Sequence, residues 1–158
     1  MIGDVMALTT GINHVALVTS DLDRLIEFYV SVFEADVIAD LEEGELRHAM
    51  LDLGGGVALH PFYVGANPHA APQGEMFRRG HLDHVALDVA DSESFELLRR
   101  RLVERGASDG LVTDFGTVRT VSFLDPDGWE GEIAQSRDGT LLPFVDRIQE
   151  PYVSFTAG

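Results

Sequence analysis

Apolar and polar residues alternate in two short segments that share the tetrapeptide His-Val-Ala-Leu, at residues 14–17 and 84–87. Side chains two residues apart lie on the same face of a strand, so each segment places its valine and leucine on one face and its histidine and alanine on the other. The apolar face can pack under a helix, whereas the small alanine leaves room in front of the imidazole. Both segments are therefore predicted to be strands whose histidine faces a cavity.

The two strands indicate an internal duplication. An aspartate follows each tetrapeptide at the same distance, Asp21 in the first copy and Asp91 in the second, and the windows 14–21 and 84–91 agree at five of eight positions. A match of this kind at an offset of 70 residues in a chain of 158 is typical of a repeated structural unit.

The periodicity after each first strand switches to helical spacing and then back to short strands separated by turns. The first half is predicted to contain a strand at 11–18, a helix from Ser20 or Asp21 to about 33, and strands at 37–40, 45–53 and 57–63. The second half is predicted to contain a strand at 81–89, a helix from Asp91 or Ser92 to about 105, and strands near 111–115, 118–124 and 130–135. This order predicts an α+β fold of two tandem βαβββ modules that form a curved mixed sheet around a shared cavity.

The predicted modules cover 11–64 and 81–135. Between them, the Pro- and Gly-containing stretch 65–80 is predicted to be a linker. A C-terminal extension, 136–158, could cover the site or join a partner subunit.

Composition excludes several classes of function. The chain has no cysteine, so disulfides and thiolate metal sites are ruled out and any metal must bind histidine, carboxylate or water. The net charge is −16, from 27 acidic residues against 11 arginines, which makes nucleic acid and anionic membranes poor partners. The sequence shows no signal peptide and no apolar run near the roughly 18 residues of a membrane span, so a cytoplasmic location is expected.

A metal site is predicted where the two halves meet. If the halves pack as related units, the cavity faces of their first strands converge, and His14 and His84 point into one space. Glu130 and Glu132 lie on one face of the last predicted strand, and a buried carboxylate requires a cation nearby. Two imidazoles and one carboxylate bind a divalent metal while leaving open positions. We predict His14, His84 and Glu132 as the ligands, with Glu130 as the competing carboxylate.

His60 is a fourth candidate ligand. The turn residues of the two halves match at an offset of 73, because Leu51, Asp52 and Gly55 correspond to Leu124, Asp125 and Gly128. This offset pairs His60 with Ile133 and not with Glu132, so the direction of its side chain depends on a slip of one residue.

Further side chains are candidates for substrate contact, although no catalytic residue is assigned. Arg47, His48 and Arg119 could contact a substrate, and an arginine near the metal would favour an anionic one. Phe62 and Phe115 are the aromatic candidates, with the core or the rim of the cavity as the alternative location.

The segments HVALVTSDLDRLIEFY and FLDPDGWEGEI, together with the duplicated order of elements, resemble the vicinal oxygen chelate superfamily over about residues 11–135. This superfamily includes glyoxalase I, bleomycin-resistance proteins and extradiol dioxygenases. The resemblance implies metal ligands on the first strands, at His14 and His84, and on the last strand of the second module, at Glu132. Glyoxalase I and methylmalonyl-CoA epimerase also use a Glu or Gln on the last strand of the first module, where this chain has only His60 as a substitute.

Three classes of function follow. The first is a metal-dependent enzyme in which Fe, Mn, Ni or Zn chelates two neighbouring oxygens of a small-molecule substrate, as in isomerases, lyases, ring-cleaving dioxygenases and thiol transferases. The second is a metal-free protein of the bleomycin-resistance type that sequesters a small molecule, and a carrier or regulatory module is a third reading. The intact His-His-Glu set favours the enzyme. The resemblance also implies a homodimer.

Overall fold

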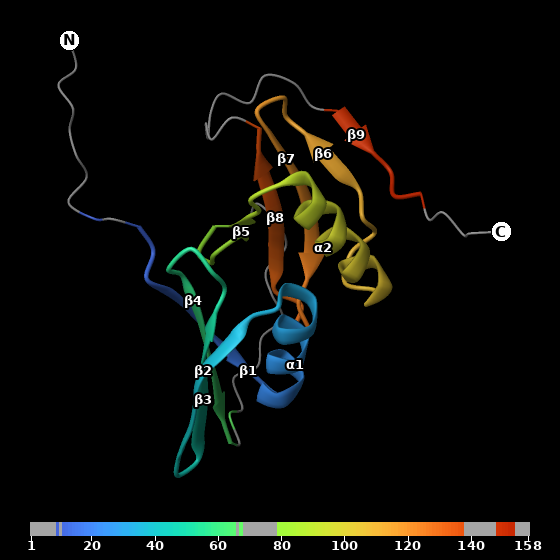
Figure 1. The fold of residues 1–158 in the computed structure, drawn as a ribbon. Helices are drawn as coiled ribbons and strands as arrows, with labels where there is room; N and C mark the ends of the chain where they lie inside the picture. Colours follow the sequence, from blue (N-terminus) through green and yellow to red (C-terminus); the bar gives the residue numbers. More distant parts are fainter. Residues whose placement is uncertain (1–8, 10, 66, 68–78, 138–147, 154–158) are drawn as a thin grey trace. The chain divides into compact units, whose positions relative to one another are not determined.

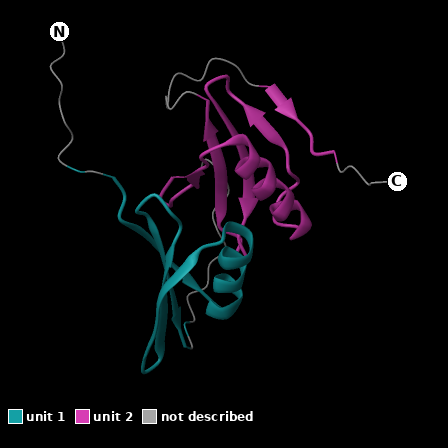
Figure 2. Ribbon diagram, viewed as in Figure 1, with its two compact units in different colours: residues 1–67 teal, residues 68–158 magenta. Residues whose placement is uncertain are grey.

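The computed structural model describes residues 9, 11–65, 67, 79–137 and 148–153. The chain divides into two compact units, unit 1 (1–67) and unit 2 (68–158), each coloured separately in Figure 2. Most of the predicted linker, including His69, lies outside the described residues, as does much of the predicted C-terminal extension. The module boundaries therefore stay a prediction.

Both units have the predicted order of strand, helix and three strands, which confirms the α+β class (Figure 1). Unit 1 contains β1 (His14–Thr19), α1 (Leu22–Phe33), β2 (Asp36–Glu43), β3 (Leu46–Asp52) and β4 (Ala58–Val64). Unit 2 contains β5 (Val85–Asp88), α2 (Ser92–Glu104), β6 (Val112–Asp114), β7 (Val118–Leu124), β8 (Glu130–Ser136) and β9 (Ile148–Glu150).

The two sheets share one topology. The strand order is β1-β4-β3-β2 in unit 1 and β5-β8-β7-β6-β9 in unit 2. In each sheet the first strand pairs in parallel with the last strand of the module, and the other neighbouring strands of the described residues pair antiparallel. Each first strand therefore lies directly beside the strand that carries the predicted carboxylate or its counterpart.

Each helix begins at the predicted aspartate. The Asp21 side chain accepts a hydrogen bond from the backbone N–H of Arg24, and the Asp91 side chain accepts one from that of Ser94. Such N-caps satisfy helix donors that have no intrahelical partner. The bond from Ser94 is also the main reason that the pKa of Asp91 is lowered. These caps fix where α1 and α2 start, directly after the first strand of each unit.

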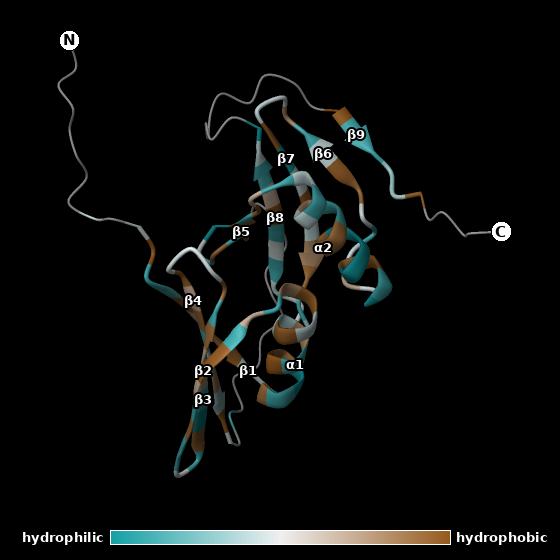
Figure 3. Ribbon diagram, viewed as in Figure 1, coloured by the Kyte–Doolittle hydropathy of each residue, from teal (hydrophilic) through white to brown (hydrophobic). Residues whose placement is uncertain are grey.

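The core of each unit lies between its helix and one face of its sheet. In unit 1 the buried residues include Leu25 and Tyr29 of α1 with Leu51 and Leu59 of the sheet, and in unit 2 they include Phe95 and Leu102 of α2 with Val121 and Ile133. Each helix carries both apolar and hydrophilic residues (Figure 3). Among the described residues, no helix combines the length and apolarity that a membrane span requires.

The two cores fill one equivalent position in different ways. Leu51 pairs with Leu59 across β3 and β4, and Phe123 pairs with Gly131 across β7 and β8. A Cβ atom on Gly131 would lie 2.4 Å from Cζ of Phe123, so the phenyl ring takes the space that a side chain at this position would need. Two leucines therefore fill this part of the core in unit 1, whereas one large ring beside a glycine fills it in unit 2.

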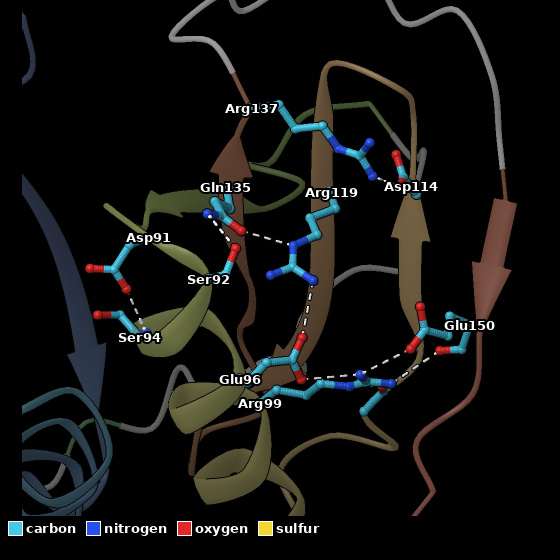
Figure 4. A network of polar contacts seen from close by, with 11 residues as sticks. Asp91, Ser92, Ser94, Glu96, Arg99, Asp114, Arg119, Gln135, Arg137 and Glu150 are labelled. Atoms are coloured by element: carbon cyan, nitrogen blue, oxygen red, sulfur yellow. Dashed lines mark hydrogen bonds and ion pairs between the residues drawn. The ribbon is translucent and has the colours of Figure 1, made fainter.

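β9, which the sequence did not predict, adds a fifth strand to unit 2. It pairs antiparallel with β6, and its backbone is fixed by the buried Arg99 of α2. The Arg99 guanidinium donates to the carbonyl oxygens of Gly110 and Glu150, and Figure 4 shows it beside Glu150. It also lies 5.2 Å from the ring centroid of Tyr152. Part of the extension thus belongs to the sheet of unit 2.

Candidate functional site

The strand face opposite the helix, here called the distal face, carries the predicted metal ligands in each unit. Along β4, Leu59 and Pro61 are buried, whereas His60 is only half-buried. Along β8, Gly131 and Ile133 are buried, whereas Glu132 is half-buried. Because side chains alternate along a strand, His60 and Glu132 lie on the distal faces of their sheets.

In unit 2, His84 and Glu132 lie close together on the distal face. The distance from His84 Nε2 to Glu132 Oε2 is 3.8 Å. The other atoms of both groups have partners, since His84 Nδ1 lies 3.0 Å from Asp83 Oδ2 and the hydroxyl of Ser122 donates to Glu132 Oε1 at 3.2 Å. One imidazole nitrogen and one carboxylate oxygen are therefore left to bind a shared partner.

Glu130 adds a second half-buried carboxylate beside this pair. Burial raises the pKa of Glu130, and the carboxylates of Asp83 and Glu132 raise it further against the opposing effect of His84. The distal face of unit 2 is thus crowded with negative charge, an environment that favours a bound cation.

In unit 1, the distal face carries three histidines on three neighbouring strands. His48 Nδ1 lies 2.9 Å from His60 Nε2, and the rings of His14 and His60 have centroids 5.6 Å apart. The ring of Phe62 stacks against His48, with centroids 5.4 Å apart, and lies 4.2 Å from His60. Burial lowers the pKa of His60, and the neighbouring His48 and His14 lower it further, so this imidazole is held neutral and able to donate a lone pair.

The strand register places His60 at the position that Glu132 has in unit 2. Ala16 of β1 pairs with His60, and Ala86 of β5 pairs with Glu132. The prediction that His60 corresponds to Ile133 was therefore wrong. The matching Asp and Gly residues that suggested an offset of 73 belong to the turns, while the strands themselves correspond at an offset of 72.

Arg47 and Arg119, which also correspond at this offset, lie on the helix sides of their sheets. Arg47 binds both carboxylate oxygens of Asp40, at 3.0 and 2.8 Å, and donates to Asp23 of α1 at 2.8 Å. The bonds to Arg47 lower the pKa of Asp40 and raise that of the guanidinium. This side is opposite to that of His48, so the structure does not bring Arg47 together with the histidines.

Arg119 is held in the same manner in unit 2. Its guanidinium donates to Gln135 at 2.8 Å and to Glu96 of α2 at 3.0 Å (Figure 4). It also lies 4.1 Å from the ring centroid of Phe95. Both arginines thus tie a strand to the helix above it.

Phe115 is half-buried at the turn between β6 and β7, where its backbone N–H donates to Val118. Phe62 is the aromatic candidate that the structure places beside the histidines.

No three His, Asp or Glu side chains gather as a ready metal site within the part of the chain that the structure describes. The described geometry supplies two partial donor sets, an imidazole with a carboxylate in unit 2 and a row of imidazoles in unit 1. Their donor chemistry fits a borderline divalent ion, for which histidine and carboxylate are the usual ligands.

Sequence reasoning missed the polar residues that contact Nδ1 of the histidines His14 and His84. Asp83 precedes His84, and Asn13 precedes His14, whose Nδ1 lies 2.8 Å from Asn13 Oδ1. The sequence did contain a signal for these contacts, because a residue with a side-chain oxygen stands directly before the histidine in both copies of the tetrapeptide.

Comparison with known families identifies the group to which this architecture corresponds. The model of the Glyoxalase/Bleomycin resistance protein/Dioxygenase superfamily matches residues 11–133. The chain belongs to this superfamily. The match spans β1 to β8 and so includes both members of the duplication.

One individual member of the superfamily is similar to this chain in sequence along most of its length. The metallothiol transferase FosB of Staphylococcus saprophyticus is 27% identical over 149 residues, which cover 91% of this chain and 88% of that protein.

Solved structures share the fold. A glyoxylase/bleomycin resistance protein/dioxygenase domain from Frankia sp. EAN1pec superposes with a TM-score of 0.68 at 22% identity, over 84% of this chain and 96% of that domain. The fosfomycin resistance protein FosX of Listeria monocytogenes, solved with Mn(II) and 1S,2S-dihydroxypropylphosphonic acid, superposes with a TM-score of 0.58 at 20% identity, over 84% of this chain and 94% of that protein.

Proposed function

We propose that this protein is a metal-dependent enzyme in which His14, His84 and Glu132 hold one divalent ion that chelates two neighbouring oxygens of a small molecule. The observation that carries the proposal is the pair in unit 2, where Nε2 of His84 and Oε2 of Glu132 lie 3.8 Å apart with their other atoms bonded elsewhere. Two ligands that each lie about 2.0–2.2 Å from one ion, at angles of about 90–110°, are separated by about 3–3.5 Å, so a small approach of the two side chains would let both atoms bind one ion.

His14 supplies the third donor because it occupies in unit 1 the position that His84 has in unit 2. His60, which corresponds to Glu132, is the candidate for a fourth ligand. A bound divalent ion would act as a Lewis acid that stabilises negative charge on a substrate oxygen. The protein residues would orient the substrate, with the imidazole of His48 and the ring of Phe62 beside it.

Relatives support this type of chemistry. FosB is named a metallothiol transferase, and FosX has been solved with Mn(II). For this chain we propose Fe, Mn, Ni or Zn as the ion and the addition of a thiol or of water to a small oxygen-containing substrate as the first reactions to test. Fosfomycin, with and without a low-molecular-weight thiol, is the substrate with which to begin.

The experiment measures metal binding before activity. Protein stripped with a chelator is titrated with Mn²⁺, Ni²⁺ and Zn²⁺ by calorimetry, and Fe²⁺ is tested under anaerobic conditions. The wild type is expected to bind one ion per chain, and both His84→Ala and Glu132→Gln are expected to lose roughly 100-fold or more in affinity. His81→Ala is the matched control, because His81 is an exposed histidine whose Nδ1 contacts the backbone oxygen of Leu82.

Metal-free binding of a small molecule is the alternative function. The superfamily to which the chain belongs includes bleomycin resistance proteins by name, and this supports the alternative. If the reconstituted wild type binds no ion, or if neither variant weakens binding, the enzyme proposal is wrong and this alternative takes its place.

We further propose a homodimer in which each site takes His14 from one chain and His84 with Glu132 from the other. Coexpression of His14→Ala and Glu132→Gln chains would then restore one intact site in each mixed dimer. Sites built within single chains would not be restored, because every chain would lack one ligand. Light scattering measures the dimer, and metal analysis of the mixed species distinguishes the two arrangements.

A further inference from the structure

The residues that directly precede the two histidines of the duplicated tetrapeptide bind those histidines in the same way. Asn13 Oδ1 lies 2.8 Å from Nδ1 of His14, and Asp83 Oδ2 lies 3.0 Å from Nδ1 of His84. The two contacts occur at the offset of 70 residues that relates the histidines themselves. One contact is made by a neutral amide and the other by a carboxylate.

The chemistry of the two acceptors fixes the position of the imidazole proton. An ionised carboxylate and an amide oxygen can only accept a hydrogen bond, so Nδ1 must carry the hydrogen in each ring. A neutral imidazole then has its lone pair on Nε2. An unconstrained imidazole in water prefers the other tautomer, so these contacts reverse the ordinary preference.

The structure assigns Asn13 and Asp83 as positioning residues that hold His14 and His84 in the tautomer whose Nε2 can bind a metal ion. This inference rests on the proposed function, because the value of a lone pair on Nε2 depends on an ion to receive it. In unit 2 the nitrogen concerned is the one that lies 3.8 Å from Glu132. Hydrogen bonds of this kind orient a ligand and raise its basicity.

The hydrogen bonds that Asp83 and Asn13 accept from the histidines are predicted to differ in strength. Asp83 adds a negative charge behind His84, which strengthens the hydrogen bond and makes Nε2 a better donor. Asn13 provides orientation without charge. The tautomer and the orientation of the ring are therefore expected to be held more firmly in His84 than in His14.

The first test is performed on metal-free protein and does not depend on metal binding. Nitrogen-15 NMR of labelled histidine at pH about 8, above the ordinary imidazole pKa of about 6.5, reports which nitrogen carries the proton. The wild type is expected to show the Nδ1–H tautomer at His14 and His84. Asp83→Ala is expected to move His84 toward the Nε2–H tautomer, while Asp83→Asn retains the acceptor and the wild-type tautomer, as Asn13 does for His14.

The second test measures Zn²⁺ and Mn²⁺ affinity in the same variants. Asp83→Ala is expected to weaken binding by roughly 10- to 100-fold, and Asp83→Asn is expected to recover most of that loss. Asp88→Ala is the control, since it removes a carboxylate from β5, four residues beyond His84, and should change affinity by less than about 3-fold at moderate ionic strength.

The outcomes separate the two proposals. If the wild type shows the Nε2–H tautomer at His84, or if Asp83→Ala binds metal as tightly as the wild type does, the positioning role is wrong and the metal site can stand. If the wild type binds no ion although His84 carries its proton on Nδ1, the proposed function is wrong and the positioning role is lost with it.

Discussion

The two sheets of this protein resemble each other on the side that faces the helix and differ on the distal face. Each sheet ties its third strand to its helix through an arginine, Arg47 to Asp23 in unit 1 and Arg119 to Glu96 in unit 2. The distal faces carry different donors, since unit 1 presents imidazoles and unit 2 presents one imidazole among carboxylates. The duplication thus repeats the structural contacts while the chemistry has become specific to each unit.

This difference suggests a division of roles. In unit 1, burial and the neighbouring imidazoles lower the pKa of His60, whereas the carboxylates of unit 2 favour a cation.

The largest expected effect is on the free energy of unfolding, and it concerns the core position occupied by Leu59 in unit 1 and Gly131 in unit 2. Gly131→Leu gives unit 2 the leucine that unit 1 has at Leu59, and it should destabilise the protein by about 3 kcal/mol because the new side chain collides with Phe123. Adding Phe123→Leu should restore much of the loss, since the pair then matches Leu51 with Leu59. Urea unfolding of the single and double variants measures the coupling. Additive effects would show that the two cores are not equivalent in packing.

A smaller difference is expected between the two arginines. Arg119→Met should lower the unfolding free energy by roughly 1.5–3 kcal/mol, because Arg119 is mostly buried and its removal deprives Gln135 of its charged donor and leaves Glu96 with Arg99 alone. Arg47→Met should cost less than about 1 kcal/mol, because its partner Asp23 is largely exposed. Equal losses in urea unfolding would contradict this ranking.

The chemical difference between the distal faces can be reduced by one substitution. His60→Glu gives unit 1 the carboxylate that Glu132 provides in unit 2. If His60 lies in the metal site, the ratio of Mn²⁺ to Zn²⁺ affinity should rise by roughly 10-fold, since carboxylates suit Mn²⁺ and imidazoles suit Zn²⁺. His81→Glu is the matched control, and an unchanged ratio in His60→Glu would exclude His60 from the site.

The smallest effect is a pH dependence of stability in metal-free protein. The folded state lowers the pKa of His60, so the unfolded chain binds a proton more readily as the pH falls below about 6.5. Stability should therefore decrease as the pH falls from about 7 to 5.5, by less than about 1 kcal/mol from this group. His60→Gln should flatten the slope in urea unfolding, and an unchanged slope would assign the pH dependence to other groups.

Much of the fold could be predicted from the sequence because period-two and helical patterns depend on local geometry. Each helix start was predicted to within two residues, and the N-caps Asp21 and Asp91 are among the alternatives given, since capping is decided by residues a few positions apart. β9 was missed because its three residues carry no strand pattern, and its pairing depends on the edge of β6 and on Arg99, both distant in sequence.

The candidate site was predictable in part. The residues His14, His84 and Glu132 followed from the duplication, but the register of His60 did not, because identical turn residues suggested the wrong offset. The location of Arg47 on the helix side could have been inferred, since its neighbour His48 must point to the opposite face. The roles of Asn13 and Asp83 depend on side-chain rotamers that no periodicity encodes.

The attachment of β9 has a practical consequence for constructing shortened versions of this protein. Truncation before Ile148 would remove the strand that pairs with β6 and would leave the backbone donors and acceptors of that edge unsatisfied. It would also deprive the buried guanidinium of Arg99 of the carbonyl of Glu150 and the ring of Tyr152. Such a fragment would be prone to self-association through the newly exposed edge even though the superfamily match ends at residue 133.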